Sequence, residues 1–318
     1  MNGLLTQSFL TALVAGGIVA AVPLMFTALG ESVSERAGVL NIGLEGMMLL
    51  GAYLGFLGAR ELHSEWLGFV AGVAGGLTGA IVMAVLSVGM GLDQIVVGIA
   101  ITLAGEGITS VLYQNQFSST QPRLGAAPSN PIPLLDQIPI LGKPVNGQAP
   151  LFSQPLIVYL GLAFAAVLAW IFRSTNIGLN LRAAGEKPEA LDAAGVSVVA
   201  TRTYAVLSTG ALAGLGGAYL SIVGAGGFQP FLTQGQGFMA IVIAMLARGR
   251  PLGVVVASFF FGITISLGTA LQAAGVTDIP DNLIHALPFV AIILALILFA
   301  RRSYLPPALA LPYVRGAR

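Results

Sequence analysis

Cysteine and charge are both scarce in this sequence. It has no cysteine, which excludes a disulfide framework, a thiol nucleophile and a cysteine metal site. Asp, Glu, Lys and Arg together make up 8% of its 318 residues, whereas an ordinary soluble domain has about 25%. The few basic residues are spread along the chain and do not form one patch, which excludes a basic nucleic-acid-binding surface.

Enzyme motifs are missing as well. The sequence has no P-loop GxxxxGK[ST], no HExxH pair and no Gly-x-Ser-x-Gly elbow. Without a P-loop the chain cannot use ATP by that route, and the other absences leave no recognisable catalytic constellation. We therefore expect neither enzymatic activity nor a bound cofactor. If the chain moves a solute against a gradient, a partner or an ion gradient must supply the energy.

Long apolar runs dominate the rest of the sequence. The mean hydropathy is +0.89, and several runs reach the roughly 20 residues that a helix needs to cross a hydrocarbon core. Continuous runs exclude the short alternating strands of a transmembrane barrel. We predict an all-α, polytopic transmembrane helical bundle, one domain over 1–318 with about 8–10 spans. The expected spans are 8–29, 39–58, 66–88, 95–112, 153–172, 203–223, 237–247, 251–271 and 283–300.

Two of these regions do not read as simple spans. The run 237–247 is too short to cross a bilayer comfortably, so we predict a broken or tilted segment that is sheltered by protein. Whether 39–58 and 224–247 are broken helices stays open, and the exact number of spans with it.

The distribution of basic residues predicts the orientation. One side has the loops 30–38, 89–94, 173–202 and 248–250 and the tail 301–318. Its basic residues are Arg36, Arg173, Arg182, Lys187, Arg202, Arg248, Arg250, Arg301, Arg302, Arg315 and Arg318; those of the other side are Arg60, Arg123 and Lys143. Cytoplasmic loops carry the excess of Lys and Arg, so we expect the first side and the C-terminus to be cytoplasmic. No basic residue precedes Arg36, which argues against a cleaved signal peptide.

The loop 113–152 on the predicted outer side is rich in proline. Its seven prolines exclude a long helix, because proline removes a donor and clashes inside one. It also contains apolar pairs such as Leu134 with Leu135, for which a disordered tether has little use. We interpret it as an ordered cap or docking surface, with a flexible connector as the alternative.

The segment 173–202 on the predicted inner side contains a short helix. Pro188 suits the first helical position, Glu189 and Asp192 suit the first turn, and Gly195 can end the helix in a left-handed conformation. Charged residues just upstream are Arg182, Glu186 and Lys187. This helix is either a solvated connection or a lever that fits a groove on a cytoplasmic motor, and the residues alone do not decide between the two.

Polar side chains within the apolar spans are the candidates for a substrate path, because such groups usually face a cavity, a partner helix or a substrate. Asn41 and Glu45 are four residues apart, so on a helix they would share a face. Glu106 lies mid-span. For Glu45 the alternative is a structural pairing with a helix terminus or with Arg36. A proton relay needs several ionisable groups across the bilayer, and two carboxylates are too few to favour one.

Amides and aromatic residues gather in the turn 224–238 on the predicted outer side. Its candidate residues are Gln229, Phe231 and Phe238, with Gln234 and Gln236 between them. This mixture suits a neutral polar ligand with a flat ring, and equally an ordinary interfacial turn. Gln94, next to the helix-capping residue Asp93, completes the candidate path.

Six blocks carry a family resemblance. They are ERAGVLNIGLEGMMLLGAYLG, IVVGIAITLAGEGITSVLY, GLNLRAAGEKPEALDAAGVSV, GALAGLGGAYLSIVG, QGQGFMAIVIAMLARGRPLG and DNLIHALPFV. The chain resembles the permeases of ABC importers for branched-chain amino acids and simple sugars. It is most similar to their nucleoside-type branch, whose partners in bacteria are basic-membrane-protein lipoproteins. Two positions depart from the family pattern: Ala247 to Arg250 replace a Phe-Gly-Arg-Trp, and Thr269 replaces an acid.

The resemblance implies a subunit of the bacterial inner membrane and three partners: a second similar permease, a cytoplasmic ABC ATPase and an extracytoplasmic substrate-binding lipoprotein. It also implies that the helix from Pro188 to Gly195 is the coupling helix. We expect the permease of an importer for nucleosides or related purine-type solutes. The same role for simple sugars, flavins or branched-chain amino acids stays open. The rival is an ion-coupled secondary transporter with Glu45 or Glu106 as its ion site.

Overall fold

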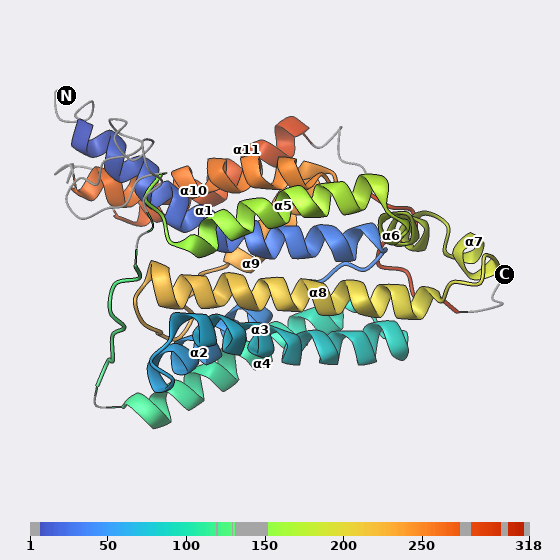
Figure 1. Cartoon of the computed structure of the whole chain (residues 1–318), viewed down its shortest axis with the longest axis horizontal. Helices are drawn as coiled ribbons and strands as arrows, with labels where there is room; N and C mark the ends of the chain where they lie inside the picture. The colour runs from blue at the N-terminus through green and yellow to red at the C-terminus, as the bar shows by residue number, and fades with distance from the viewer. Residues whose placement is uncertain are drawn as a thin grey trace.

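The apolar runs form helices, because a backbone at membrane depth must satisfy its own polar groups. The computed structural model describes residues 7–118, 120–128, 130, 152–273, 281–299 and 305–314, and these contain no strand. The helices are α1 Gln7–Arg36, α2 Leu44–Glu61, α3 Glu65–Met83, η1 Ala84–Gly89, α4 Gln94–Phe117, α5 Leu156–Ser174, α6 Asn176–Glu186, α7 Pro188–Ala193, α8 Val198–Tyr219, η3 Leu220–Gly224, α9 Gln236–Ala247, α10 Pro251–Ala273 and α11 Asp281–Phe299. Figure 1 shows them as a bundle of long helices with α6 and α7 at one end.

Each expected span coincides with a helix, so the predicted polytopic helical class is confirmed. Six helices within the described ranges are long and apolar enough to cross a membrane: α1, α3 with η1, α4, α5, α8 with η3, and α10. Helix α9 has 12 residues, seven of them buried, as expected for a short segment sheltered by protein. Helix α2 begins at Leu44, so the expected span 39–58 is broken and its first residues form a connection.

Helix α1 is longer than the sequence suggested. We expected a loop over 30–38, but α1 continues to Arg36. Its polar residues there are buried: Glu31, Ser32 and Ser34 are completely inaccessible. The Ser34 and Thr209 hydroxyl groups are 2.8 Å apart, which joins α1 to α8. The expected loop is wrong because these side chains find partners inside the bundle.

Closely spaced glycines let α3 and α8 approach each other. A Cβ atom on Gly76 would lie 2.0 Å from the carbonyl oxygen of Gly210, and one on Gly214 would lie 2.3 Å from that of Gly72. No side chain fits at either position. The contact is therefore a backbone-to-backbone one, the kind of approach that small residues allow between membrane helices.

The two ends of the bundle differ in what covers them (Figure 1). At one end, the chain that follows α4 crosses the turn 224–238, and the Leu124 N–H donates to the Gly226 carbonyl at 2.8 Å. Most of the expected cap, residues 131–151, lies outside the described residues. At the other end, the C-terminal segment 305–314 docks beside α6: Ala308 N–H donates to Gly185 and Ala310 N–H to Gly38, at 3.0 and 3.2 Å.

Candidate functional site

The connection between α1 and α2 (residues 37–43, the 37–43 connection) runs through the interior. Asn41 is completely buried. Its N–H donates to Glu31 Oε1 at 3.0 Å, and its own Oδ1 accepts from the Gly43 N–H at 3.1 Å. Asn41 thus precedes α2, so our expectation that it shares a helix face with Glu45 is wrong. It folds a turn, as Asn side chains do when they bond the backbone two residues on.

Gln94 holds the same connection from α4. Its Oε1 accepts the Leu40 N–H at 2.8 Å, and the side chain is buried. Thr102, two turns further along α4, donates to the Ile42 carbonyl at 3.3 Å. Irregular backbone at membrane depth is tolerated only where protein or a cavity satisfies it. Side chains from α1 and α4 therefore fix the path of the 37–43 connection.

Glu45 joins the start of α2 to the start of α9. One carboxylate oxygen accepts from the Thr233 hydroxyl and from the Gly235 N–H at 2.8 Å. The other accepts from the Gly237 N–H at 2.7 Å. The first N–H groups of a helix have no partner within it, and a negative charge there is favourable. A single buried carboxylate, 3% exposed, thus serves two helix N-termini; we name this contact the Glu45 junction.

The fit at the junction is tight. A Cβ atom on Gly237 would lie 2.5 Å from the Glu45 nitrogen and 2.6 Å from its Cα, so only glycine is possible there. Glu106 on α4 is close enough for its carboxylate to interact electrostatically with that of Glu45. The neighbouring Gln236 has a buried Oε1 with no hydrogen-bond partner among the described residues. Of the candidate path residues, Glu45 and Glu106 thus lie within electrostatic range of each other.

The remaining candidate residues, which lie in the turn 224–238, are exposed on the surface. Gln229 is exposed, and Phe231 and Phe238 are 55% and 44% exposed. Phe231 and Gln234 have φ angles of +60° and +46°, uncommon for residues other than glycine. The turn therefore presents these three side chains on its surface, while its Thr233, Gly235 and Gly237 bind Glu45.

The predicted inner helix has the expected ends. Helix α7 begins with Pro188 at its first position. It closes with Gly195 at φ +83°. The Gly195 N–H donates to Asp192 at 2.9 Å and the Val196 N–H to Leu191 at 3.2 Å, the pair of bonds of a Schellman motif. Helix α6, which we did not predict as a separate element, precedes it. On α6 Arg182 and Glu186 form an ion pair at 2.9 Å.

A small core binds α6 and α7 to the bundle. Ala184, Leu191 and Val198 are buried together, and Val196 and Tyr313 pack against them. The cluster thus joins α6, α7, α8, the connection between α7 and α8, and the C-terminal segment. Glu189 on α7 is exposed. The segment 176–197 is therefore a firmly attached unit with a charged outer face.

Arg202, in the second turn of α8, ties this unit to the 37–43 connection. It is 3% exposed, and its guanidinium donates only to backbone carbonyls: Ala37 at 3.1 Å, Ala184 at 3.2 Å, Leu311 at 2.7 Å and Ala308 at 3.5 Å. Arginine has five N–H donors in a fixed fork, so one side chain can bind four carbonyls from three chain segments. We name this contact the Arg202 junction.

Sequence reasoning missed the roles of three of these residues: Glu31, Arg202 and Thr233. We had assigned Arg202 to a cytoplasmic loop, and the structure corrects this to a buried position in a helix. A signal existed for Glu31, because it opens the polar stretch that runs directly into an apolar span. Within the described ranges, His, Asp and Glu form no group of three that could hold a metal ion.

Sequence comparison identifies the family of this bundle. Residues 13–300 match the family described as branched-chain amino acid transport system / permease component. The match covers well over half of the chain, so the chain belongs to this family of membrane permeases.

Three relatives of known name are similar over most of their length. The nucleoside ABC transporter permease protein NupC of Lactococcus lactis is 32% identical over 96% of this chain and 97% of its own. The guanosine ABC transporter permease protein NupQ of Bacillus subtilis is 33% identical over 97% and 98%. The putative glucose ABC transporter permease protein TsgC13 of Haloferax volcanii is 34% identical over 86% of this chain and 82% of its own.

Proposed function

We propose that this chain is the transmembrane permease subunit of an ABC importer for nucleosides, with ATP hydrolysis on a separate cytoplasmic subunit. The observation that carries the proposal is the similarity, over nearly the whole chain, to permeases named for nucleosides and guanosine. Relatives named for glucose match a smaller share of both chains, although one of them is as similar in identity, so a sugar is the second choice of solute.

The coupling segment of such an importer is, in our proposal, 176–197. Helix α7 is short, begins at a proline and is closed by a glycine, and its Glu189 is exposed. The coupling residues are Arg182, Glu186, Pro188, Glu189, Asp192 and Gly195. This end of the bundle contains most of the basic residues, so we propose that it and the C-terminus are cytoplasmic.

A continuous series of contacts leads from α7 to the bundle interior. Leu191 packs with Val198 at the start of α8. One turn further on, Arg202 binds the Ala37 carbonyl. The 37–43 connection that begins there ends at α2, where Glu45 holds α9. A push on α7 by an ATPase would thus be transmitted to the Glu45 junction, and we propose that this junction is the gate.

The solute path lies, in our proposal, beside this gate. Glu45 and Glu106 supply the polar groups at membrane depth, and Gln229, Phe231 and Phe238 form the entry on the outer side. Asn41 and Gln94 act indirectly, because both are buried and bond the connection. The full importer would add a second similar permease and an extracytoplasmic lipoprotein that delivers the solute.

A pair of substitutions at one residue tests the coupling role. Proline cannot adopt the φ of +83° at Gly195 and would remove its N–H bond to Asp192. Alanine keeps the N–H, and its Cβ would meet nothing within 4 Å, so it costs only about 1–2 kcal/mol of backbone strain. We expect Gly195→Pro to abolish ATP-dependent uptake of radiolabelled guanosine with the protein still inserted in the membrane, and Gly195→Ala to retain most of it.

The measurement uses membrane vesicles with and without the co-purified ATPase. Unchanged ATP-dependent uptake in the Gly195→Pro variant would contradict the coupling role of 176–197. Uptake by this chain alone under an ion gradient, with no ATPase present, would instead make it a secondary transporter with Glu45 or Glu106 as the ion site.

A further inference from the structure

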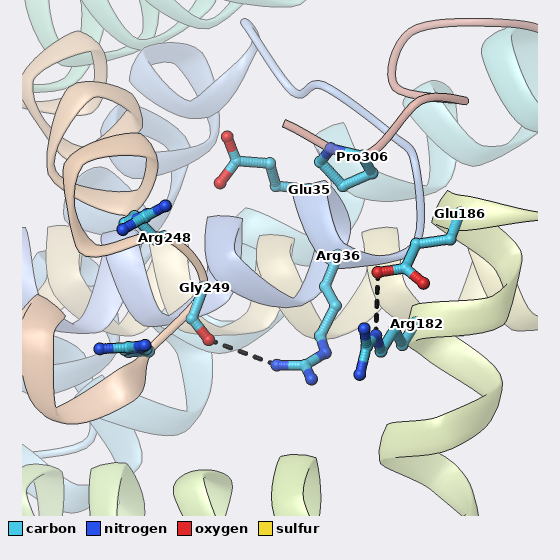
Figure 2. A pocket seen from close by; sticks show the side chains of 8 residues that line it. Glu35, Arg36, Arg182, Glu186, Arg248, Gly249 and Pro306 are labelled. Atoms are coloured by element: carbon cyan, nitrogen blue, oxygen red, sulfur yellow. Dashed lines mark hydrogen bonds and ion pairs between the residues drawn. The ribbon is translucent and has the colours of Figure 1, made fainter. Parts of the chain in front are cut away.

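A basic cavity of about 350 Å³ lies between the end of α1, helix α6 and the turn from α9 to α10 (Figure 2). Its charged lining residues are Glu35, Arg36, Arg182, Glu186, Arg248 and Arg250. Four arginines against two glutamates leave a formal excess of two positive charges. The cavity is separate from the Glu45 junction, and neither the candidate solute path nor the family match accounts for it.

Two of the arginines are held in place from within the cavity wall. Arg182 pairs with Glu186, and Arg36 donates to the Gly249 carbonyl at 3.4 Å, as the dashed lines in Figure 2 mark. The Arg36 bond connects the end of α1 to the α9–α10 turn. Arg248 and Arg250 flank that glycine and are exposed.

The backbone of the turn keeps these two arginines beside the cavity. Arg248 ends α9 with a φ of +56°, and Gly249 follows with +63°. Left-handed conformations are unfavourable for residues with a side chain. The turn closes with bonds from the Arg248 N–H to Met245 and from the Arg250 N–H to Ala247, at 3.1 and 3.0 Å.

Glu35 is a buried hydrogen-bond acceptor in the cavity wall that a bound ligand could satisfy. It lines the cavity, yet it is only 4% exposed, and its Oε1 has no hydrogen-bond partner among the described residues. A buried acceptor without a donor is costly, and natural structures rarely leave one. A ligand that brings a hydroxyl or amino group to Glu35 would satisfy it.

We propose that this cavity binds a phosphate ester that also carries a hydroxyl or amino donor. The guanidinium groups of Arg248 and Arg250 would bind the phosphate oxygens, which match the planar fork of arginine. The donor group of the ligand would bind Glu35 Oε1. The volume lies at the small end of the roughly 300–1,000 Å³ typical of ligand pockets, which suits a nucleoside monophosphate or a lipid headgroup.

Both kinds of ligand combine a phosphate ester with a hydroxyl donor. A soluble nucleotide has ribose hydroxyls beside its phosphate, and the glycerol headgroup of phosphatidylglycerol has hydroxyls beside its phosphodiester. In either case the ligand would bridge α1, α6 and the α9–α10 turn. Because α6 belongs to the coupling segment, an occupied cavity should slow transport; this consequence rests on the proposed function, whereas the binding itself does not.

The test measures binding to the purified full-length chain in nanodiscs of phosphatidylcholine. The probes are guanosine 5′-monophosphate and inorganic phosphate in solution, and phosphatidylglycerol is added to a second set of nanodiscs and followed by native mass spectrometry. The variant is the double substitution Arg248→Gln and Arg250→Gln. The control is Arg173→Gln, an exposed arginine at the same end of the bundle that does not line the cavity.

We expect the double substitution to weaken binding of the nucleotide or of the lipid by about tenfold or more, and the control to change it by less than about twofold. Loss confined to the nucleotide identifies a soluble ligand, and loss confined to phosphatidylglycerol identifies a lipid. Glu35→Gln removes the repulsion of phosphate, so inorganic phosphate should bind more tightly, while the preference for the ester over inorganic phosphate should fall.

Two results would overturn the proposal. One is that neither probe binds the unsubstituted chain. The other is that the double substitution and the Arg173→Gln control change binding equally, which would mean diffuse attraction to the basic end of the bundle. Neither result bears on guanosine uptake, so the proposal on this cavity and the proposed transport function can fail separately.

Discussion

The Glu45 junction and the Arg202 junction solve the same problem with opposite charges. Each places one charged side chain deep among helices, where an unpaired charge is expensive. Glu45 takes three donors, two of them N–H groups at the start of α9. Arg202 takes four carbonyls, among them Ala184 near the end of α6 and Ala37 just beyond α1.

The polarity of the helices explains this division. Helix N-termini have unpaired N–H groups and C-termini have unpaired carbonyls, so a carboxylate suits the first and a guanidinium the second. The comparison teaches that neither residue needs a charged partner. Each is stabilised by hydrogen bonds that come mostly from backbone groups. Each therefore depends on the positions of two or more chain segments.

The largest effect is expected at the Arg202 junction. Arg202→Met keeps a long flexible side chain but removes every donor, and with them the hydrogen bonds to four backbone carbonyls. We expect a loss of stability on the order of 4 kcal/mol, seen as early loss of the monodisperse peak when heated samples are run on size-exclusion chromatography. Arg173→Met, at an exposed position, should cost less than about 1 kcal/mol. Equal melting of the two variants would show that the four bonds contribute little.

The second largest effect is expected at the Glu45 junction, through its glycine. Gly237→Ala would place a Cβ 2.5 Å from the Glu45 nitrogen, and forcing the backbones apart should cost about 3 kcal/mol. The matched control is Gly107→Ala on α4, where a Cβ meets nothing within 4 Å and alanine should stabilise the helix by about 0.5–1 kcal/mol. The same heated chromatography assay measures both. A Gly237→Ala variant as stable as Gly107→Ala would mean that α9 does not rest on Glu45.

Much of the fold could be predicted from the sequence, because its signals are local. Apolar length located the apolar helices, though not α6, and Pro188 with Gly195 marked both ends of α7. The continuation of α1 could not be predicted in this way. Glu31, Glu35 and Arg36 have the composition of a loop, and the contacts made there lie outside α1: Glu31 accepts from the Asn41 N–H, and Arg36 donates to the Gly249 carbonyl.

The candidate site was predictable only in part, for the same reason. Glu45 was recognisable as a polar group at membrane depth, but its partners Thr233, Gly235 and Gly237 lie about 190 residues away. Arg202 binds Ala37, which is 165 residues away. No periodicity or spacing reports such contacts. The two junctions therefore emerge from the fold, although their charged residues are visible in the sequence.

The smallest losses of stability are expected from substitutions of Glu45 itself and of its partner Thr233. Glu45→Gln keeps the size of the side chain but turns one acceptor into a donor, which then faces the N–H groups of α9. We expect a loss of about 2 kcal/mol, less than at Arg202 because one acceptor remains. Thr233→Val removes the hydroxyl that binds the same carboxylate and should cost about 1 kcal/mol.

Combining the two substitutions separates the contributions of Thr233 and of the α9 N-terminus. If Thr233 acts only through Glu45, the double variant should be about 1 kcal/mol more stable than the sum of the single losses predicts. Melting curves of the four proteins give this coupling directly. Strict additivity would mean that Glu45 holds α9 through the Gly235 and Gly237 N–H groups alone. The proposed gate would then consist of a carboxylate bound to a helix N-terminus, with no contribution from the Thr233 side chain.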